Sequence, residues 1–142
     1  MKLKDCLEKI IDNRGRNPKY YDKEVYPVID NEDGSYSIVE IDLLKSNYPE
    51  KTILTSSNYE TITNISYYAG KLYFISGKNS LIEYSISESY SKALTNEGEA
   101  SSFVIDKENN VMYVSYRPGG QNPGIYVLDF TTNSFTQIIS LG

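Results

Sequence analysis

The sequence predicts a mainly β protein made of three four-stranded antiparallel repeats, preceded by a short N-terminal helix. Composition supports this first, because the chain holds 14 tyrosines, no tryptophan and many isoleucines and valines, residues that favour strands. Length and polarity come second: 142 residues, 39% hydrophobic and 23% charged, are typical of one soluble domain with a real core. The third observation is a recurring order of short apolar runs separated by turn residues.

The N-terminal head, residues 1–24, is expected to hold a helix followed by a polar connector. Asn13 and Gly15 suit the end of that helix because both tolerate left-handed backbone geometry, and Pro18 prevents its continuation. We expect the apolar stripe of the helix to pack on a sheet. The stripe has i, i+3, i+4, i+7, i+8 spacing and consists of Leu3, Cys6, Leu7, Ile10 and Ile11.

The body, residues 25–142, contains an internal repeat. Three apolar runs, at 38–42, 81–85 and 125–129, align at offsets of 43 and 44 residues. Each run is expected to be the third strand of a repeat, with one strand before it and another after it. The expected preceding strands are 25–29, 72–76 and 111–116, the following ones 51–55, 92–95 and 136–140, and the last two repeats add upstream strands at 62–67 and 102–105.

The length of the repeat indicates a propeller-like arrangement. A unit of about 40–50 residues with four strands is typical of one β-propeller blade. The expected blades are residues 25–60, 61–99 and 100–142. Hairpin turns are expected where Gly, Asn and Asp gather, at 31–34, 69–70, 77–79 and 108–110.

Three blades leave exposed edge strands, because closed propellers usually have four to eight blades. A homodimer in which two copies join head to tail would supply six blades, and we expect this assembly. Two alternatives stay open. The chain is a fragment of a longer protein, or it forms a compact curved sheet capped by the helix.

Two stretches of the body resemble blades of bacterial β-propeller repeat proteins. They read "KLYFISGKNSLIEYSI" at 71–86 and "VMYVSYRPGGQNPGIYVLDF" at 111–130. Both have an aromatic residue in the second strand, and the later one ends its third strand in Leu-Asp. The resemblance implies an architecture and a binding surface, and it does not imply a reaction.

The head has a more particular resemblance. Residues 3–31, "LKDCLEKIIDNRGRNPKYYDKEVYPVIDN", are similar to the start of type I restriction-modification specificity subunits, whose pattern is IxDxRGxxPxY followed by PVI. The resemblance implies sequence-specific DNA recognition without catalysis, in a complex with methyltransferase and motor-nuclease subunits. It covers 29 of the 142 residues. The candidate DNA-binding or partner-binding residues are Arg14, Arg16, Lys19, Tyr20 and Tyr21.

Charge limits where nucleic acid could bind. The net charge is −5, of which residues 1–31 contribute +1 and residues 32–142 contribute −6. Because phosphate binding depends on cationic side chains, DNA contact is expected only from the head. The alternative is a solvated connector, with the tyrosines covering a sheet edge.

A second candidate site is the loop at residues 116–124, "YRPGGQNPG". Its three glycines and two prolines predict a loop of defined shape, and loops on rigid scaffolds often bind partners. Arg117, Gln121 and Asn122 are expected to offer hydrogen-bond donors at its tip. The alternative is a long hairpin connection with no ligand.

Composition also narrows the function classes. The chain has no histidine, and its one cysteine, Cys6, can form no intrachain disulfide or cysteine-rich zinc site. We therefore expect no enzyme activity, no cofactor and no metal site. We also expect no membrane span, because no apolar run approaches the roughly 20 residues required. The start lacks the apolar core of a signal peptide, so a cytoplasmic protein is expected.

The expected function is a non-enzymatic module that binds a protein partner through its loops and head. The alternatives are a DNA-recognition component resembling a type I specificity subunit, or a decoy of that subunit that inhibits the restriction complex.

Overall fold

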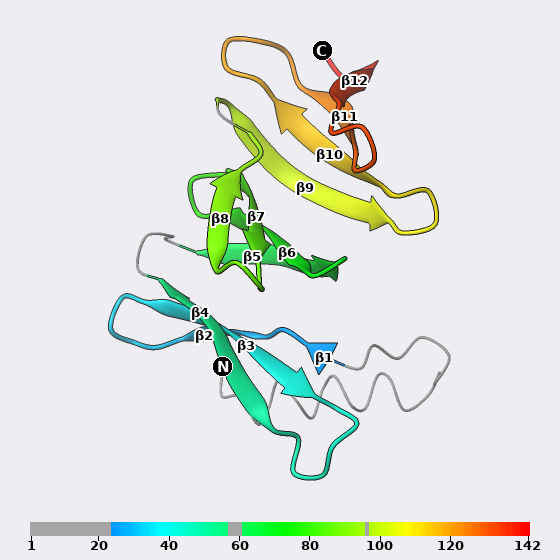
Figure 1. Cartoon of the computed structure of the whole chain (residues 1–142). Helices are drawn as coiled ribbons and strands as arrows, with labels where there is room; N and C mark the ends of the chain where they lie inside the picture. The colour runs from blue at the N-terminus through cyan, green and yellow to red at the C-terminus, as the bar shows by residue number, and fades with distance from the viewer. Residues whose placement is uncertain (1–23, 57–60, 96) are drawn as a thin grey trace. The chain divides into compact units, whose positions relative to one another are not determined.

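The computed structural model describes residues 24–56, 61–95 and 97–142, and every regular element in these ranges is a strand (Figure 1). A mainly β fold with three antiparallel sheets is therefore confirmed, while the predicted helix lies outside the described residues. The strands are β1 Glu24–Val25, β2 Val28–Asp30, β3 Tyr36–Asp42, β4 Glu50–Ser56, β5 Ile62–Tyr68, β6 Lys71–Ser76, β7 Leu81–Ser85, β8 Tyr90–Ala93, β9 Glu99–Asp106, β10 Val111–Arg117, β11 Gly124–Asp129 and β12 Phe135–Ser140.

The chain divides into two compact units, residues 1–59 and 60–142. In the first unit, β3 is the central strand, with β4 along one edge and both β1 and β2 along the other. The two short strands share a single register on β3 and are separated at Pro27. Proline has no N–H to give to the ladder, but its carbonyl still accepts a hydrogen bond from Val39 N at 3.1 Å. β1 and β2 are thus one edge strand interrupted by a proline.

One face of the first sheet carries a small hydrophobic cluster. Val39 and Ile41 are buried on β3, and the partly buried Ile29 and Leu43 pack against them. The alternation along β3 places these side chains on one face and Ile38 on the other, as period-two patterning requires. Ile38 is fully buried as well, so both faces of the central strand exclude water.

The second unit contains two four-stranded sheets, in the orders β5-β6-β7-β8 and β9-β10-β11-β12. Each is a meander, because neighbouring strands are consecutive in sequence and antiparallel. The turns have the left-handed residues that the sequence predicts, including Gly70, Asn79 and Asn110. The described sheets remain open at their edges and form no closed propeller.

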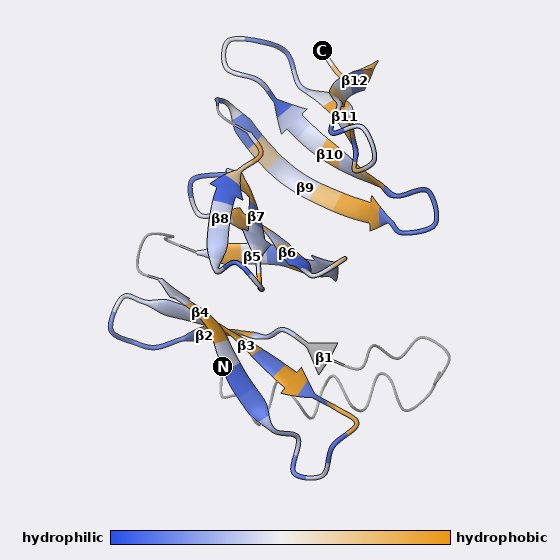
Figure 2. Cartoon of the chain, viewed as in Figure 1, coloured by the Kyte–Doolittle hydropathy of each residue, from blue (hydrophilic) through white to orange (hydrophobic). Residues whose placement is uncertain are grey.

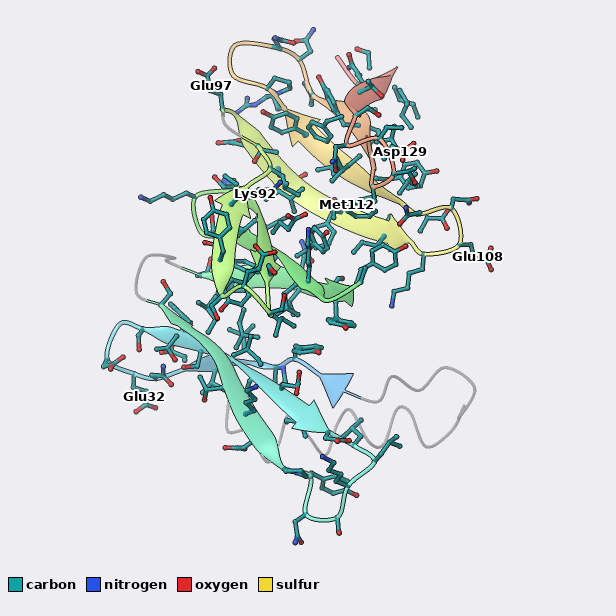
Figure 3. All side chains as sticks on the ribbon, in the orientation of Figure 1. Glu32, Lys92, Glu97, Glu108, Met112 and Asp129 are labelled. Carbon is teal, nitrogen blue, oxygen red and sulfur yellow. The ribbon has the colours of Figure 1, made fainter. Side chains whose placement is uncertain are left out.

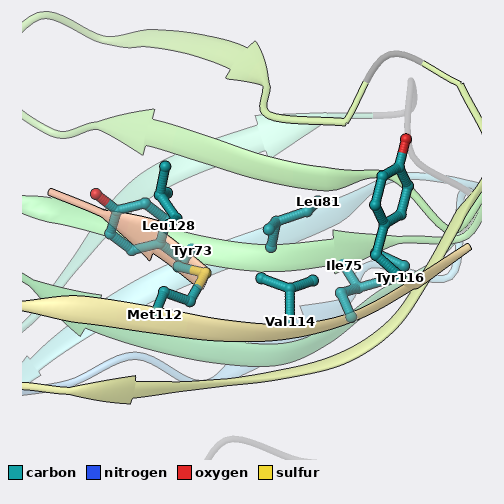
Figure 4. Packing of buried hydrophobic residues seen from close by; sticks show 8 residues of the cluster. Tyr73, Ile75, Leu81, Met112, Val114, Tyr116 and Leu128 are labelled. Atoms are coloured by element: carbon teal, nitrogen blue, oxygen red, sulfur yellow. The ribbon is translucent and has the colours of Figure 1, made fainter. Parts of the chain in front are cut away.

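A hydrophobic cluster joins the two sheets of this unit. Figure 4 shows Leu81 of β7 and Val114 of β10 pointing toward each other across the space between the sheets. A backbone hydrogen bond from Ala100 N to Asn79 O, 2.8 Å long, also links them. The buried members of the cluster are Tyr73, Ile75, Leu81, Ala100, Met112, Val114, Tyr116 and Leu128.

Aromatic side chains close one end of this cluster. The Phe130 ring lies 5.2 Å from the Tyr68 ring and 5.5 Å from the Tyr73 ring, measured between centroids. The Tyr68 hydroxyl donates to Asn110 Oδ1 at 2.6 Å. Each contact joins one sheet to the other, so the two sheets pack as one core.

The fourth strand of the middle repeat differs from its expected bounds. The sequence predicts 92–95, whereas β8 runs from Tyr90 to Ala93. Leu94 N still donates to Leu81 O at 2.8 Å, and the Thr95 hydroxyl then accepts from Leu81 N at 3.1 Å. The Thr95 side chain therefore accepts the hydrogen bond that a backbone carbonyl accepts in a regular ladder. Apolar patterning does not reveal this exchange.

Candidate functional site

The structure describes one of the two candidate sites. Arg14, Arg16, Lys19, Tyr20 and Tyr21 lie outside the described residues, so their role stays a prediction. The loop between β10 and β11 is described in full. It stands at the end of the last sheet (Figure 1), and its first residues contact residues 97–98, just before β9.

Arg117 lies at the base of this loop, and the expectation that it lies at the tip is wrong. β10 continues through Arg117, which pairs with Glu99 of β9 in the ladder. Its guanidinium Nη2 lies 2.9 Å from Glu99 Oε2, and both side chains are more than half exposed. An exposed ion pair of this kind adds little stability, typically about 0–1 kcal/mol. The ion pair holds the Arg117 side chain against β9.

Residues 97–98 support the loop from one side. The Tyr116 hydroxyl donates to the backbone carbonyl of Glu97, and burial raises the pKa of this phenol, which keeps the donor protonated. Gly98 has a φ of +86°, and a Cβ placed there would lie 1.9 Å from the Arg117 carbonyl oxygen. Only glycine permits this approach of two backbone segments. In Figure 3 the Glu97 side chain is labelled at this end of the sheet.

The C-terminal residues support the loop from the other side. Leu141 N donates to Pro123 O at 2.9 Å, and a Cβ at Gly142 would lie 2.5 Å from Asn122 Cβ. Within the loop, Gln121 N donates to Pro118 O at 3.0 Å, which closes a tight turn. The loop has the defined shape that its prolines and glycines predict.

The side chains at the tip of the loop are open to solvent. Gln121 and Asn122 are both exposed, and each amide offers two donors and one acceptor oxygen. Such groups can form reversible hydrogen bonds with a protein or sugar surface. They supply no nucleophile and no group that titrates near neutral pH.

Glu83 of β7 lies at the centre of a second group of polar side chains. It accepts a hydrogen bond of 3.0 Å from the Tyr73 hydroxyl, and its carboxylate lies 3.4 Å from Lys71 Nζ and 3.7 Å from Lys92 Nζ. Burial, followed by the negative charge of Glu83, raises the pKa of Tyr73 well above its ordinary value. The Tyr73 phenol therefore stays protonated and continues to donate to Glu83. The contacts of Glu83 with Tyr73, Lys71 and Lys92 link three neighbouring strands of the sheet.

A surface that sequence reasoning missed lies on the last sheet, on the side away from the hydrophobic cluster. It contains a shallow hollow with a volume of about 190 Å³. Side chains of β9 to β12 form two rows across this side, which we call the outer face. The first row is Val104, Tyr113, Val127 and Thr136, and the second is Ser102, Ser115, Ile125 and Ile139.

The signal for this surface was present in the repeat. When Lys71–Ser76 is aligned with 111–116, Tyr113 matches Tyr73, and the third-strand alignment matches Ile125 with Leu81. The sequence alone does not show that Tyr73 is buried and Tyr113 is exposed, because this depends on which sheet faces are covered in the tertiary structure.

Neither a metal site nor a membrane-spanning helix is found in the part of the chain that the structure describes. Among these residues, no group of three or more His, Cys, Asp or Glu side chains is placed to hold a metal ion. The described ranges also contain no helix long and apolar enough to cross a membrane.

The fold and the loop define the class of protein: an all-β protein with three antiparallel sheets among its described residues, the last of which carries a shaped loop. No family model matches the chain, and neither does any curated protein. A solved structure does match: the crystal structure of an uncharacterized protein from Listeria monocytogenes EGD-e, with a TM-score of 0.55 and 15% sequence identity. The match covers 83% of this chain and 37% of that one, so the chain spans little more than a third of its length. At this identity the likeness shows the fold alone.

Proposed function

We propose that the protein is a non-enzymatic, propeller-like binding module that holds a protein partner through the 116–124 loop and the N-terminal head. The observation that carries the proposal is the support of this loop on both sides, by Gly98 and by Leu141. A loop that is ordered before binding loses less conformational entropy when it binds. The exposed amides of Gln121 and Asn122 then provide directional contacts.

A pull-down with matched variants tests this role. The tagged chain is used to capture proteins from a lysate that contains a type I restriction system, and the captured proteins are identified by mass spectrometry. We expect the double variant Gln121→Ala/Asn122→Ala to capture at least about fivefold less partner, because the loss of two directional hydrogen bonds costs about 1–3 kcal/mol.

The control places two alanines in an exposed turn at the other end of the same sheet, as Lys107→Ala/Glu108→Ala. This double variant preserves the net charge and should capture the partner as well as the unchanged chain does. Equal losses with both double variants would contradict a role for the loop. A partner that depends on Arg14 and Arg16 but not on the loop would assign binding to the head.

DNA recognition is the second candidate function, and the resemblance of residues 3–31 to type I specificity subunits favours it. If the head contacts phosphates, affinity for duplex DNA should fall steeply with salt. Arg14→Ala should reduce the slope of log K against log salt by about 1. Filter binding or fluorescence anisotropy at several salt concentrations measures this slope. Absence of duplex binding at low salt would remove this candidate.

The decoy alternative has a distinct outcome in the pull-down. Recovery of the methyltransferase subunit, without any duplex binding by the protein, would indicate that the head imitates a specificity subunit. We further propose that the protein works as a homodimer, in which two copies contribute six sheets and cover exposed sheet surfaces.

A further inference from the structure

The outer face of the last sheet is unusually apolar for a surface that is open to solvent. Val104 is 62% exposed, Ile139 51% and Tyr113 36%, and these three side chains belong to three different strands. Figure 2 shows hydrophobic colour toward the C-terminal end of β9, where Val104 lies. Contiguous exposed apolar side chains of this kind mark interaction surfaces.

The internal repeat indicates what kind of partner this face fits. In the preceding sheet, the matched residues Tyr73 and Leu81 are 2% and 0% exposed, because the sheet β9–β12 packs over them. Tyr113 and Ile125 hold the same positions one repeat later. This face is thus covered by another β-sheet in β5–β8 and is open in β9–β12. Because the matched face receives a sheet, we expect the partner of the outer face to be a flat apolar sheet face as well.

Charge favours a second copy of the chain as the source of that face. A net charge of −5 opposes self-association through charged surfaces, yet neither row of the outer face contains a charged residue. The nearest charges lie beyond the rows, at the Arg117–Glu99 ion pair and at Asp106 and Asp129. Two copies could therefore bring these faces together without burying an unpaired charge.

The burial of the first sheet decides between two ways of pairing the copies. In a head-to-tail ring, the outer face would meet the side of β3 that carries Val39 and Ile41, the residues matched with Tyr126 and Leu128. Those β3 side chains are already 6% and 1% exposed. They are not open to a partner, whereas the outer face is.

We propose that two copies of the chain associate through their outer faces, each sheet β9–β12 packing on the same sheet of its partner about a two-fold axis. Such self-complementary contacts are the commonest arrangement of homodimers. This inference rests on the proposed homodimer and identifies its surface. It is independent of the 116–124 loop, whose role is tested by partner capture.

The test introduces charge at Val104 and Ile139, two exposed large hydrophobic side chains of the outer face. The double variant Val104→Glu/Ile139→Glu should be a folded monomer in analytical ultracentrifugation at concentrations where the unchanged chain is a dimer. The corresponding lysine variant, Val104→Lys/Ile139→Lys, should also be monomeric. Because both positions are exposed, neither change should disturb the far-ultraviolet circular dichroism spectrum. Mixing the two variants should restore a dimer, since opposite charges then face each other.

The control variant Leu44→Glu/Tyr90→Glu adds the same charge at exposed apolar side chains outside this face, and it should remain dimeric. A monomeric unchanged chain at high protein concentration would overturn the proposal. A dimer that persists in the glutamate variant would overturn the surface while leaving the homodimer intact. Failure of the mixture to associate would overturn the two-fold arrangement and favour head-to-tail pairing. None of these outcomes bears on partner capture by the loop.

Discussion

Replacing Leu81 with alanine is expected to lower the free energy of unfolding by about 2–5 kcal/mol, the range observed for buried leucines. Leu81 is fully buried in the cluster that joins β5–β8 to β9–β12, so the substitution removes apolar contacts and leaves a cavity between two close-packed sheets. Urea denaturation followed by circular dichroism measures the effect. Leu141→Ala, the same change at an exposed leucine of the same unit, should alter stability by less than about 0.5 kcal/mol.

A double-mutant cycle makes this prediction specific to the packing of the two sheets. Leu81 and Val114 come from different sheets and point toward each other (Figure 4). The losses caused by Leu81→Ala and Val114→Ala should therefore be non-additive by about 0.5–3 kcal/mol. Additive losses would show that the sheets do not pack through this pair.

Substituting Gly98 with alanine is expected to be the most damaging change near the loop, with a loss of at least about 2 kcal/mol. Two effects combine. The positive φ of +86° strains any side chain, and the new Cβ would overlap the Arg117 carbonyl oxygen, so one backbone segment must move. The hydrogen bond from the Tyr116 hydroxyl to the Glu97 carbonyl should weaken as well. We expect faster proteolytic cleavage within 118–123, alongside the loss measured by denaturation.

Gly120→Ala is the matched control for this substitution. Gly120 lies in the same loop with a φ of +73°, but a Cβ added there would have nothing within 4 Å. Only backbone strain remains there, about 1–2 kcal/mol for a left-handed non-glycine residue. Similar losses and similar cleavage rates for the two variants would mean that the close approach at Gly98 does not brace the loop.

Most strands of the two complete meanders followed from sequence, although β9 begins at Glu99 and not at residue 102, and β8 begins at Tyr90 and not at residue 92. The run 72–75 is apolar on both faces, which predicts a central strand, and β6 is buried along both faces. The turns were equally readable, since the residues at Gly34, Gly70 and Asn79 adopt the positive φ that hairpins require. Local chemistry was sufficient at these points because strand periodicity and turn geometry are local properties.

Predictions of the candidate site were less complete. The prolines and glycines of residues 116–124 predicted a shaped loop, but they did not reveal that its shape depends on Gly98 and Leu141. Those contacts join segments that are distant in sequence. The position of Arg117 was misjudged for a related reason, because pairing with Glu99 extends β10 beyond its last apolar residue.

The sequence by itself determined the strand order, the turns and the length of the repeat, because alternating apolar residues and left-handed turn residues act on their own neighbours. Only the tertiary structure decided which face of each repeat is covered. Tyr73 and Tyr113 hold equivalent positions in matched strands of the repeat, yet one is buried by a neighbouring sheet and the other is 36% exposed. The burial of a residue depends on what packs against its sheet, and no local pattern records that.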